Sequence, residues 1–236
     1  SPLCGRNFEY FSEDPFLSGV AVENEVVGLQ SKGVIPYVKH YAFNDEEDSR
    51  IGIGIWLNEQ SAREIYLKPF EYAVSPAHGN AHGIMSSFNR VGCIWTSNSP
   101  ELMETILRDE FGFDGVVLTD MALGQNAYMS YDAFMHGTDL FLDPSGAKSQ
   151  FDGYAPNAGF RQAVRRAVHR YLYVIANYSA AMNGFSSASK IVPVTPWWQA
   201  LINGLQFSFL ALGVLSAAML ILCQTRGYRK ERKVRG

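Results

Sequence analysis

The sequence predicts an α/β domain with parallel strands, followed by one transmembrane helix. Short apolar stretches bounded by turn residues alternate, over residues 1–184, with longer stretches of helical periodicity. A helix that crosses over between two strands of one sheet makes those strands parallel. Farther along, residues 197–223 contain no charged side chain, which predicts a helix that crosses a membrane.

Four stretches have the composition of strands that are covered on both faces. They are "VIPYVKH" (34–40), "GIMSSF" (83–88), "GVVLTD" (115–120) and "TDLFLD" (138–143). Parallel strands of this kind form either an open doubly wound sheet or a closed barrel, and periodicity does not choose between the two. Residues 1–185 are fewer than the roughly 250 of a complete eight-stranded barrel, so a barrel formed here would lack some strands.

Helical patterns lie between and after these strands. Residues 61–74 have apolar positions at helical spacing, and Pro69 within them favours a kink. Residues 99–111 begin with a Ser N-cap and a Pro in the first turn. A long last helix is expected to end before the "NG" pair at 183–184. Its predicted buried stripe consists of Phe160, Val164, Val168, Leu172 and Ile175.

Residues 197–223 are expected to cross the membrane as a single helix. Ala200 to Cys223 would rise about 36 Å, which is enough to span a bilayer. Trp197 and Trp198 suit the membrane interface at one end of this helix. The alternative, a core helix of a globular domain, agrees less well with this flank and with the basic one that follows.

The flanking segments predict the topology. Residues 224–236 hold six Lys or Arg against one Glu, so the positive-inside rule puts this tail in the cytoplasm. The globular part then lies outside the cell, on a single-pass cell-membrane protein. Residues 186–196, rich in Ser and punctuated by Pro, form the predicted linker.

Charge and composition exclude several classes of protein. The chain is 47% hydrophobic, which is enough for a sizeable core. The formal net charge is −3; because the tail 224–236 carries +5, residues 1–223 carry −8, which argues against nucleic acid as a partner. Three cysteines without metal-ligand spacing predict neither a disulfide framework nor a zinc site. The chain opens at Ser1 on a dense polar and aromatic motif, and we expect an amino-terminal part to precede it.

Polar side chains stand at the ends of all four predicted strands, where ligands bind in α/β folds. Asp120 ends one strand, and Lys39 and His40 end another. The remaining strand-end candidates are Ser87, Asn89, Asp139 and Asp143. Asp120 alone could be a helix cap or part of a loop ion pair, and Lys39–His40 a solvated strand exit. Together they suit catalysis, since a cation near a carboxylate lowers its pKa and keeps it ionised as a nucleophile.

Five motifs, in order and at suitable intervals, resemble those of glycoside hydrolase family 3, and its β-glucosidases most closely. They are "GRNFEYFSEDPFLSG" (5–19), "VKHYAFNDEEDSR" (38–50), "IMSSFNRVG" (84–92), "LRDEFGFDGVVLTDM" (107–121) and "GTDLFLDP" (137–144). The resemblance implies an incomplete (β/α)8 TIM-type barrel over residues 1–185, with its N-terminal strands missing from the chain.

The same resemblance implies roles for five residues. Asp120 matches the family's nucleophile. Arg6 and the Lys39–His40 pair match positions that hydrogen-bond sugar hydroxyls, and Met85 matches a residue that lines the pocket. The substrate would be an oligosaccharide or β-glucoside, and no metal or organic cofactor is expected.

Two departures from the family pattern stand out. Phe88 occupies the place of a Tyr whose hydroxyl could orient Asp120. The acid/base residue of the β-glucosidases comes from a separate α/β sandwich domain that this chain lacks. Another branch of the family, the β-N-acetylglucosaminidases, uses an Asp–His dyad, but this chain has Arg50 where the His would be needed. We therefore expect a permuted protein, with the sandwich domain upstream of the barrel.

Three functions follow from these observations. The first is a retaining, exo-acting β-glycosidase tethered to the membrane, whose isolated barrel fragment is weakly active or inactive. The second is a catalytically inactive, membrane-tethered carbohydrate-binding module on the same barrel. The third, an unrelated membrane-anchored α/β domain, would leave five ordered motifs to chance.

Overall fold

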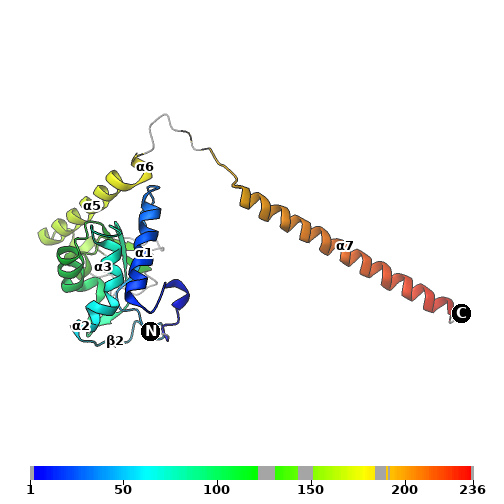
Figure 1. The fold of residues 1–236 in the computed structure, drawn as a ribbon, viewed down its shortest axis with the longest axis horizontal. Coiled ribbons are helices and arrows are strands. Elements are labelled where there is room, and N and C mark those ends of the chain that lie inside the picture. Colours follow the sequence, from blue (N-terminus) through cyan, green and yellow to red (C-terminus); the bar gives the residue numbers. More distant parts are fainter. Residues whose placement is uncertain (1–2, 122–130, 143–150, 184–189, 191, 235–236) are drawn as a thin grey trace. The chain divides into compact units, whose positions relative to one another are not determined.

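The computed structural model describes residues 3–121, 131–142, 151–183, 190 and 192–234. These divide into two compact units, Ser1–Ser186 and Ser187–Gly236, each of which is considered by itself. Figure 1 shows the course of the chain, with α1 (Pro15–Gln30, blue) near its start and α7 (Trp197–Val234, orange to red) near its end.

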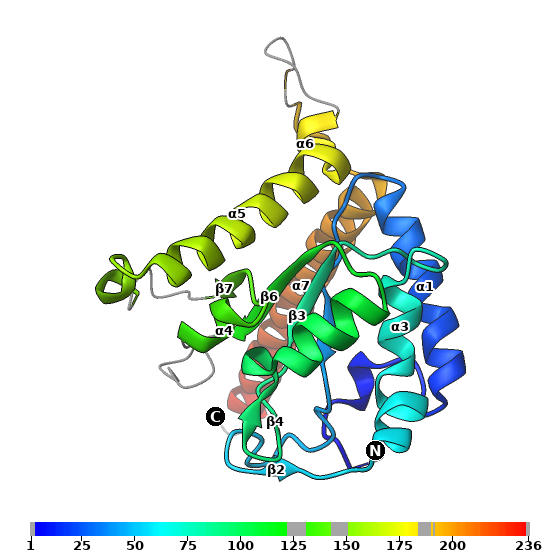
Figure 2. The same ribbon diagram turned by 90° about the vertical axis from the view of Figure 1, so that its left-hand side faces the viewer.

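A four-stranded parallel sheet forms the centre of the first unit (Figure 2). Its strands are β1 (Val38–Tyr41), β3 (Gly83–Ser86), β6 (Val116–Met121) and β7 (Leu140–Leu142). The four predicted strands are thereby confirmed, and all three neighbouring pairs are parallel. Their order in the sheet is their order in the chain, without the reversal that marks a doubly wound sheet. Parallel strands that neighbour each other in chain order are the arrangement of a (β/α) barrel.

Helices connect the strands and cover one face of the sheet. The longer ones are α1 (Pro15–Gln30), α3 (Lys68–Val74), η4 (Glu101–Glu110) and α5 (Ala158–Tyr178). Shorter helices are η1 (Asn7–Glu9), α2 (Glu59–Ser61), η2 (Ala62–Tyr66), η3 (Thr96–Asn98), α4 (Tyr131–Met135), η5 (Asp152–Tyr154) and α6 (Ala180–Asn183).

The helix α1 lies within the motif-rich start of the chain, for which the sequence analysis specified no helix. Asp14 caps it by accepting a hydrogen bond of 2.7 Å from the Leu17 amide, and Pro15 stands in its first turn. It packs closely on α3, because a Cβ at Gly19 would come within 2.8 Å of the Tyr72 ring.

Two predicted helices differ in detail from the observed ones. Residues 61–74 do not form one kinked helix: wide π-type turns (η2) run from Ala62 to Tyr66, and α3 starts afresh at Lys68. Pro69 then lies in the first turn of α3, where its missing N–H costs nothing. Residues 101–110 are also wound in π-type turns rather than as a regular α-helix.

The predicted apolar stripe of the last helix is partly wrong. The residues of α5 that are buried are Phe160, Ala163, Ala167 and Val174, whereas Val168 and Leu172 are 50% and 57% exposed. Small alanine side chains let a helix backbone approach its neighbours closely, so the helix buries this face rather than its larger aliphatic one. The helix also ends at Tyr178, before the predicted "NG" stop, and α6 follows it.

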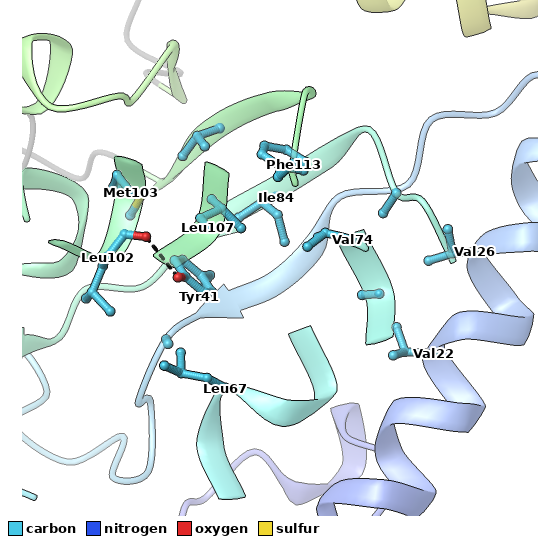
Figure 3. Close-up of a cluster of buried hydrophobic side chains, with 14 of the residues drawn as sticks. Val22, Val26, Tyr41, Leu67, Val74, Ile84, Leu102, Met103, Leu107 and Phe113 are labelled. Carbon is cyan, nitrogen blue, oxygen red and sulfur yellow. Dashed lines mark hydrogen bonds between the residues drawn. The ribbon is translucent and has the colours of Figure 1, made fainter. Parts of the chain in front are cut away.

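The core lies between the sheet and the helices α1, α3 and η4 (Figure 3). Ile84 of β3, Val117 of β6 and Leu107 of η4 are completely buried there. Tyr41 of β1 is completely buried as well, and its hydroxyl donates a 2.9 Å hydrogen bond to the carbonyl oxygen of Leu102. The core therefore fixes three strands against the helices that connect them.

A second, three-stranded sheet was not predicted. It contains β2 (Gly54–Ile55), β4 (Arg90–Val91) and β5 (Ile94–Trp95), in the order β2-β4-β5. The strands β4 and β5 form an antiparallel hairpin that follows β3, and β2 runs parallel to β4. Strands of two residues carry no readable periodicity, which is why the sequence did not reveal them.

The second unit is dominated by α7 (Trp197–Val234). Within it, Trp197–Thr225 is long and apolar enough to cross a membrane, with a mean hydropathy of 2.2 in its most apolar window. This finding concerns length and composition only.

Candidate active site

The sheet brings four of the five predicted site residues to the carboxyl ends of adjacent strands. Lys39 and His40 lie in β1, Met85 in β3 and Asp120 in β6. Because Met85 is paired with Leu118 in register, the side chains of Met85, Leu118 and Asp120 share one face of the sheet. Arg6, which precedes η1, joins them through its contact with His40.

Glu9 binds both predicted sugar-binding cations. The Arg6 guanidinium donates two hydrogen bonds to the Glu9 carboxylate, at 2.8 Å from Nε and 2.7 Å from Nη2. Lys39 Nζ lies 2.7 Å from Oε2 of the same carboxylate. Hydrogen bonds from Lys39 and then Arg6 lower the pKa of Glu9 to about 2, although partial burial opposes the shift. Glu9 is therefore an anion at any physiological pH.

His40 is held as a neutral ring. Burial, followed by the charges of Arg6 and Lys39, lowers the pKa of His40 to about 3. Arg6 Nη1 lies 3.1 Å from His40 Nε2, and a guanidinium can only donate, so Nε2 accepts. The proton of the neutral ring is then on Nδ1, which lies 2.9 Å from the Tyr10 hydroxyl oxygen and donates to it. His40 Nε2 is 3.6 Å from Asp120 Oδ2, but without a proton it forms no ion pair there.

The two oxygens of the Asp120 carboxylate differ in their hydrogen bonding. Oδ1 accepts a 2.6 Å hydrogen bond from the Met121 amide. Oδ2 is buried and has no hydrogen-bond partner among the residues that the structure describes. Burial raises the pKa of Asp120, and the Met121 hydrogen bond and the charges of Arg50, Arg6 and Lys39 oppose the rise. We expected the neighbouring cations to lower this pKa; they do act in that direction, but burial outweighs them.

Arg50 is a site residue that the sequence analysis missed. Its guanidinium lies 4.2 Å from the centre of the Phe88 ring, and its Nη1 is 2.9 Å from Glu47 Oε1. It is the foremost of the three cations that oppose the raised pKa of Asp120. The sequence analysis named Arg50 only as the residue that stands where another branch of the family has His. Its position in the loop after the Lys39–His40 strand was the available signal.

The ring of Phe88 links the site to the small sheet. Phe88 is buried and packs against Ile51 and Trp95. Arg90 lies 4.2 Å over the Trp95 ring and donates a 2.9 Å hydrogen bond to the Ile51 carbonyl oxygen. Arg90 and the rings of Phe88 and Trp95 thus pack around the segment that carries Arg50, which restricts where the Arg50 guanidinium can go.

The other strand-end candidates have different places. The Ser87 hydroxyl donates a 2.7 Å hydrogen bond to the Ala42 carbonyl oxygen, which joins the ends of β3 and β1. Asn89 is fully buried, and its side-chain amide has no hydrogen-bond partner among the described residues. Asp139 precedes β7 and is paired with Arg108 and Arg170, so it lies outside the site. Asp143 falls outside the described residues.

A cavity of about 360 Å³ adjoins the site. Glu9, Tyr10, Lys39 and His40 line its polar side. Its apolar side includes Val22, Phe43, Ile65, Tyr66 and Phe70. Asp120 is not among the lining residues, so this cavity reaches His40 but not the carboxylate.

A parallel sheet in chain order, with a partly buried carboxylate, two cations and an imidazole near the carboxyl ends of its strands, is an arrangement typical of (β/α) barrels, which bind their ligands at that end. Residues 1–156 match the family "Glycosyl hydrolase family 3 N terminal domain". The chain belongs to this family and is similar to its β-glucosidases.

Relatives agree in sequence. The chain is 42% identical over 139 residues to "Probable beta-glucosidase J" of Neosartorya fischeri, which is 59% of this chain and 16% of that protein. It is 46% identical over 119 residues to "Beta-glucosidase" of Ruminococcus albus, or 50% of this chain and 12% of that one. The matches thus span less than a fifth of these relatives.

Solved structures agree in fold. The Bifidobacterium adolescentis GH3 beta-glucosidase superimposes with a TM-score of 0.69 at 30% identity, over 81% of this chain and 28% of that one. Beta-glucosidase 3B from Thermotoga neapolitana, in complex with glucose, superimposes with a TM-score of 0.68 at 30% identity, over 78% and 26%. The parallel sheet described above therefore matches a portion of the barrel domain of this family.

Proposed function

We propose that this chain supplies the nucleophile and sugar-binding residues of a retaining, exo-acting β-glycosidase. The enzyme would hydrolyse the bonds of terminal β-linked sugars, with β-glucosides as the foremost candidate substrates. The observation that carries this proposal is the state of Asp120: a partly buried carboxylate with one oxygen fixed by a backbone amide and the other, which is buried, without a partner among the described residues. An oxygen in that state has a lone pair available for attack. His40 Nε2 lies 3.6 Å from it, and Arg6 Nη1 lies 3.1 Å from the same nitrogen.

The reaction would proceed in two displacements. In the first, Asp120 Oδ2 forms a bond to the anomeric carbon while the bond to the leaving oxygen breaks, and a general acid protonates that oxygen. In the second, water, deprotonated by the same group, displaces the carboxylate with a second inversion. The sugar therefore keeps its anomeric configuration, and Asp120 returns to its starting state.

The general acid must come from another group than the carboxylates beside Asp120. A general acid needs a raised pKa so that it carries a proton near neutral pH. The pKa of Glu9 is lowered to about 2, and hydrogen bonds and ion pairs lower the pKa of Glu47 as well, although burial opposes the shift. This supports an acid supplied by a further domain of the whole protein, in keeping with the expected upstream sandwich.

Glucose is the proposed sugar for the site. Glucose is the ligand named for the Thermotoga neapolitana enzyme, and for the Kluyveromyces marxianus beta-glucosidase, whose structure superimposes with a TM-score of 0.65 at 31% identity. In the present chain, an ammonium and a guanidinium that share one carboxylate provide several donors for the vicinal hydroxyls of a hexose.

The test uses the full-length protein and a 2-fluoro aryl β-glucoside, which forms the covalent intermediate quickly and releases it slowly. We expect mass spectrometry to find the sugar on the peptide that contains Asp120, and the variant Asp120→Asn to lose turnover by about a thousandfold or more. A protein that forms no adduct but still binds glucose would instead be the inactive carbohydrate-binding module. Full turnover by Asp120→Asn would show that Asp120 is not the nucleophile and that the protein is not an inactive binding module.

We also propose that α7 anchors the protein in the cell membrane, with the globular part outside and the C-terminus in the cytoplasm. Length, composition and the basic residues that follow support this topology. Protease added to sealed cells should digest the globular part and leave a membrane-protected fragment that carries a C-terminal epitope. Release of the intact protein by alkaline carbonate would contradict the anchor.

A further inference from the structure

We propose that Glu9 is a positioning residue of this site: it holds the Lys39 ammonium in place for a sugar hydroxyl, with Arg6 as its fixed support. This inference rests on the proposed glycosidase function, and it names a residue to which the sequence analysis assigned no role.

The two cations depend on Glu9 to different degrees. Arg6 has additional partners, since its Nη1 also lies 3.1 Å from His40 Nε2 and 3.2 Å from Glu47 Oε1. Lys39 has none of these: within the described part of the chain, Glu9 is the carboxylate that lies within ion-pair distance of its Nζ. Removing the Glu9 charge should therefore leave Arg6 in place and free Lys39.

The exposure of the side chains points the same way. The Lys39 side chain is 41% exposed, whereas those of Arg6 and Glu9 are 20% and 21% exposed. A lysine has four rotatable bonds and a strongly hydrated ammonium, so a half-exposed one without a partner samples many positions. Glu9 is the last residue of η1, and Arg6 grips its carboxylate with two parallel hydrogen bonds, so this anion is itself fixed.

Charge balance gives Glu9 a second effect on the same lysine. With Glu9 ionised, Arg6, Lys39 and Glu9 sum to +1; with a neutral side chain at position 9, two adjacent cations face each other without a shared anion. The repulsion would push the mobile lysine, and not the anchored arginine, away into solvent. The site would then lose an oriented donor while its fold persisted.

The experiment compares four full-length proteins on an aryl β-glucoside: wild type, Glu9→Gln, Lys39→Ala and the double variant. We expect Glu9→Gln to raise KM about tenfold with kcat changed less than about threefold, because a hydroxyl held in both ground and transition states is uniform binding. Since both changes remove the same oriented ammonium, the double variant should be hardly worse than Lys39→Ala alone. Glu110→Gln, which breaks a surface ion pair with Arg63, is the matched control and should leave KM unchanged.

Effects of Glu9→Gln and Lys39→Ala that multiply fully in kcat/KM would overturn the proposal, since a merely structural carboxylate acts independently of the lysine. If Glu9→Gln does not melt cooperatively, Glu9→Asp keeps the charge with a shorter reach; it should fold and still show the raised KM. If the wild type neither turns over nor forms an adduct, the proposed function fails, and calorimetric titration with glucose then tests the positioning role by itself. Equal glucose affinity in the wild type and Glu9→Gln would overturn it.

Discussion

The Arg50 guanidinium lies 4.2 Å from the centre of the Phe88 ring, so the residue that stands in place of the family's Tyr is in direct contact with the arginine that stands where another branch of the family has His. Phe88 cannot donate a hydrogen bond to Asp120, but it provides an aromatic face on which a guanidinium rests. That guanidinium is the foremost cation acting on the pKa of Asp120. The loss of a hydroxyl and the presence of an arginine are thus parts of one local arrangement.

Replacing Arg50 should shift the pH dependence of catalysis. In the proposed mechanism attack requires an ionised Asp120; burial raises the pKa of Asp120, and the charge of Arg50 counteracts that rise. In Arg50→Met the pKa of Asp120 should therefore rise further, and the acidic limb of kcat/KM should move to higher pH. Arg63→Met, which removes a cation from an exposed surface pair, serves as the control and should leave this limb in place. An unchanged limb in Arg50→Met would show that its charge does not reach Asp120.

Asp120→Asn should stabilise the protein while it removes activity. Among the described residues Asp120 Oδ2 is buried without a hydrogen-bond partner, which costs folding free energy, and a neutral amide of the same shape costs less. We expect the free energy of unfolding, measured by urea denaturation at pH 7, to increase by about 1 kcal/mol. A decrease of similar size would mean that the charge is well solvated or paired in the folded protein. This is the trade between stability and function that active sites commonly show.

His40 should make the fold sensitive to mild acid. The pKa of His40 falls to about 3 in the folded protein, from about 6.5 when unfolded, so below pH 6.5 the unfolded state binds the proton first. Stability should fall as the pH drops from about 6.5 towards 3, by at most about 1.4 kcal/mol per pH unit from this group. His40→Gln should lose that slope between pH 6.5 and 5, where the lowered pKa values of Glu9 and Glu47 have no effect yet. Identical slopes in the two proteins would assign the sensitivity to another group.

Asp139→Asn should destabilise the domain strongly. The Asp139 carboxylate is completely buried between Arg108 Nη2 at 2.8 Å and Arg170 Nη1 at 3.1 Å, and it also accepts from the Val117 amide. Removing its charge leaves the Arg108 guanidinium, with only 7% of its side chain exposed, facing a second cation. We expect a loss of about 3–5 kcal/mol in the free energy of unfolding.

The comparison for this loss is Glu110→Gln, which breaks the exposed pair with Arg63 and should cost less than about 1 kcal/mol. Losses of equal size in the two variants would mean that Asp139 is not acting as a buried counter-ion. Chemical denaturation followed by circular dichroism measures both.

The parallel strands, and the grouping of polar residues at their ends, could be predicted from the sequence. The strands ending in Asp120 and in Lys39–His40 are apolar runs between turn residues, and parallel pairing brings their polar ends together whatever the loops do. The role of Glu9 could not be predicted in this way. Its ion pair with Lys39 joins residues 30 positions apart, across the helix α1 and the turns on either side of it, and depends on how these segments pack.

Two failures have a common physical cause. The buried face of α5 was predicted from the large apolar side chains. The face that is buried contains Ala163 and Ala167, because close approach of the helix backbone to its neighbours favours small residues. The expected effect of cations on Asp120 ranked charge above burial, whereas the burial of its carboxylate is the larger influence on its pKa. In both cases the deciding quantity is a distance between elements, which periodicity does not contain.

The hydrogen bond from Tyr41 to the Leu102 carbonyl oxygen bears on how the site can move. Tyr41 belongs to the strand that bears Lys39 and His40, and Leu102 to the helix that leads into the strand of Asp120. This hydrogen bond links β1 directly to η4. The strand of Lys39 and His40 and the helix before the strand of Asp120 should therefore move together as one rigid unit. A sugar bound as proposed would then meet side chains that are already in position. Any movement on binding would be confined to segments outside these two elements.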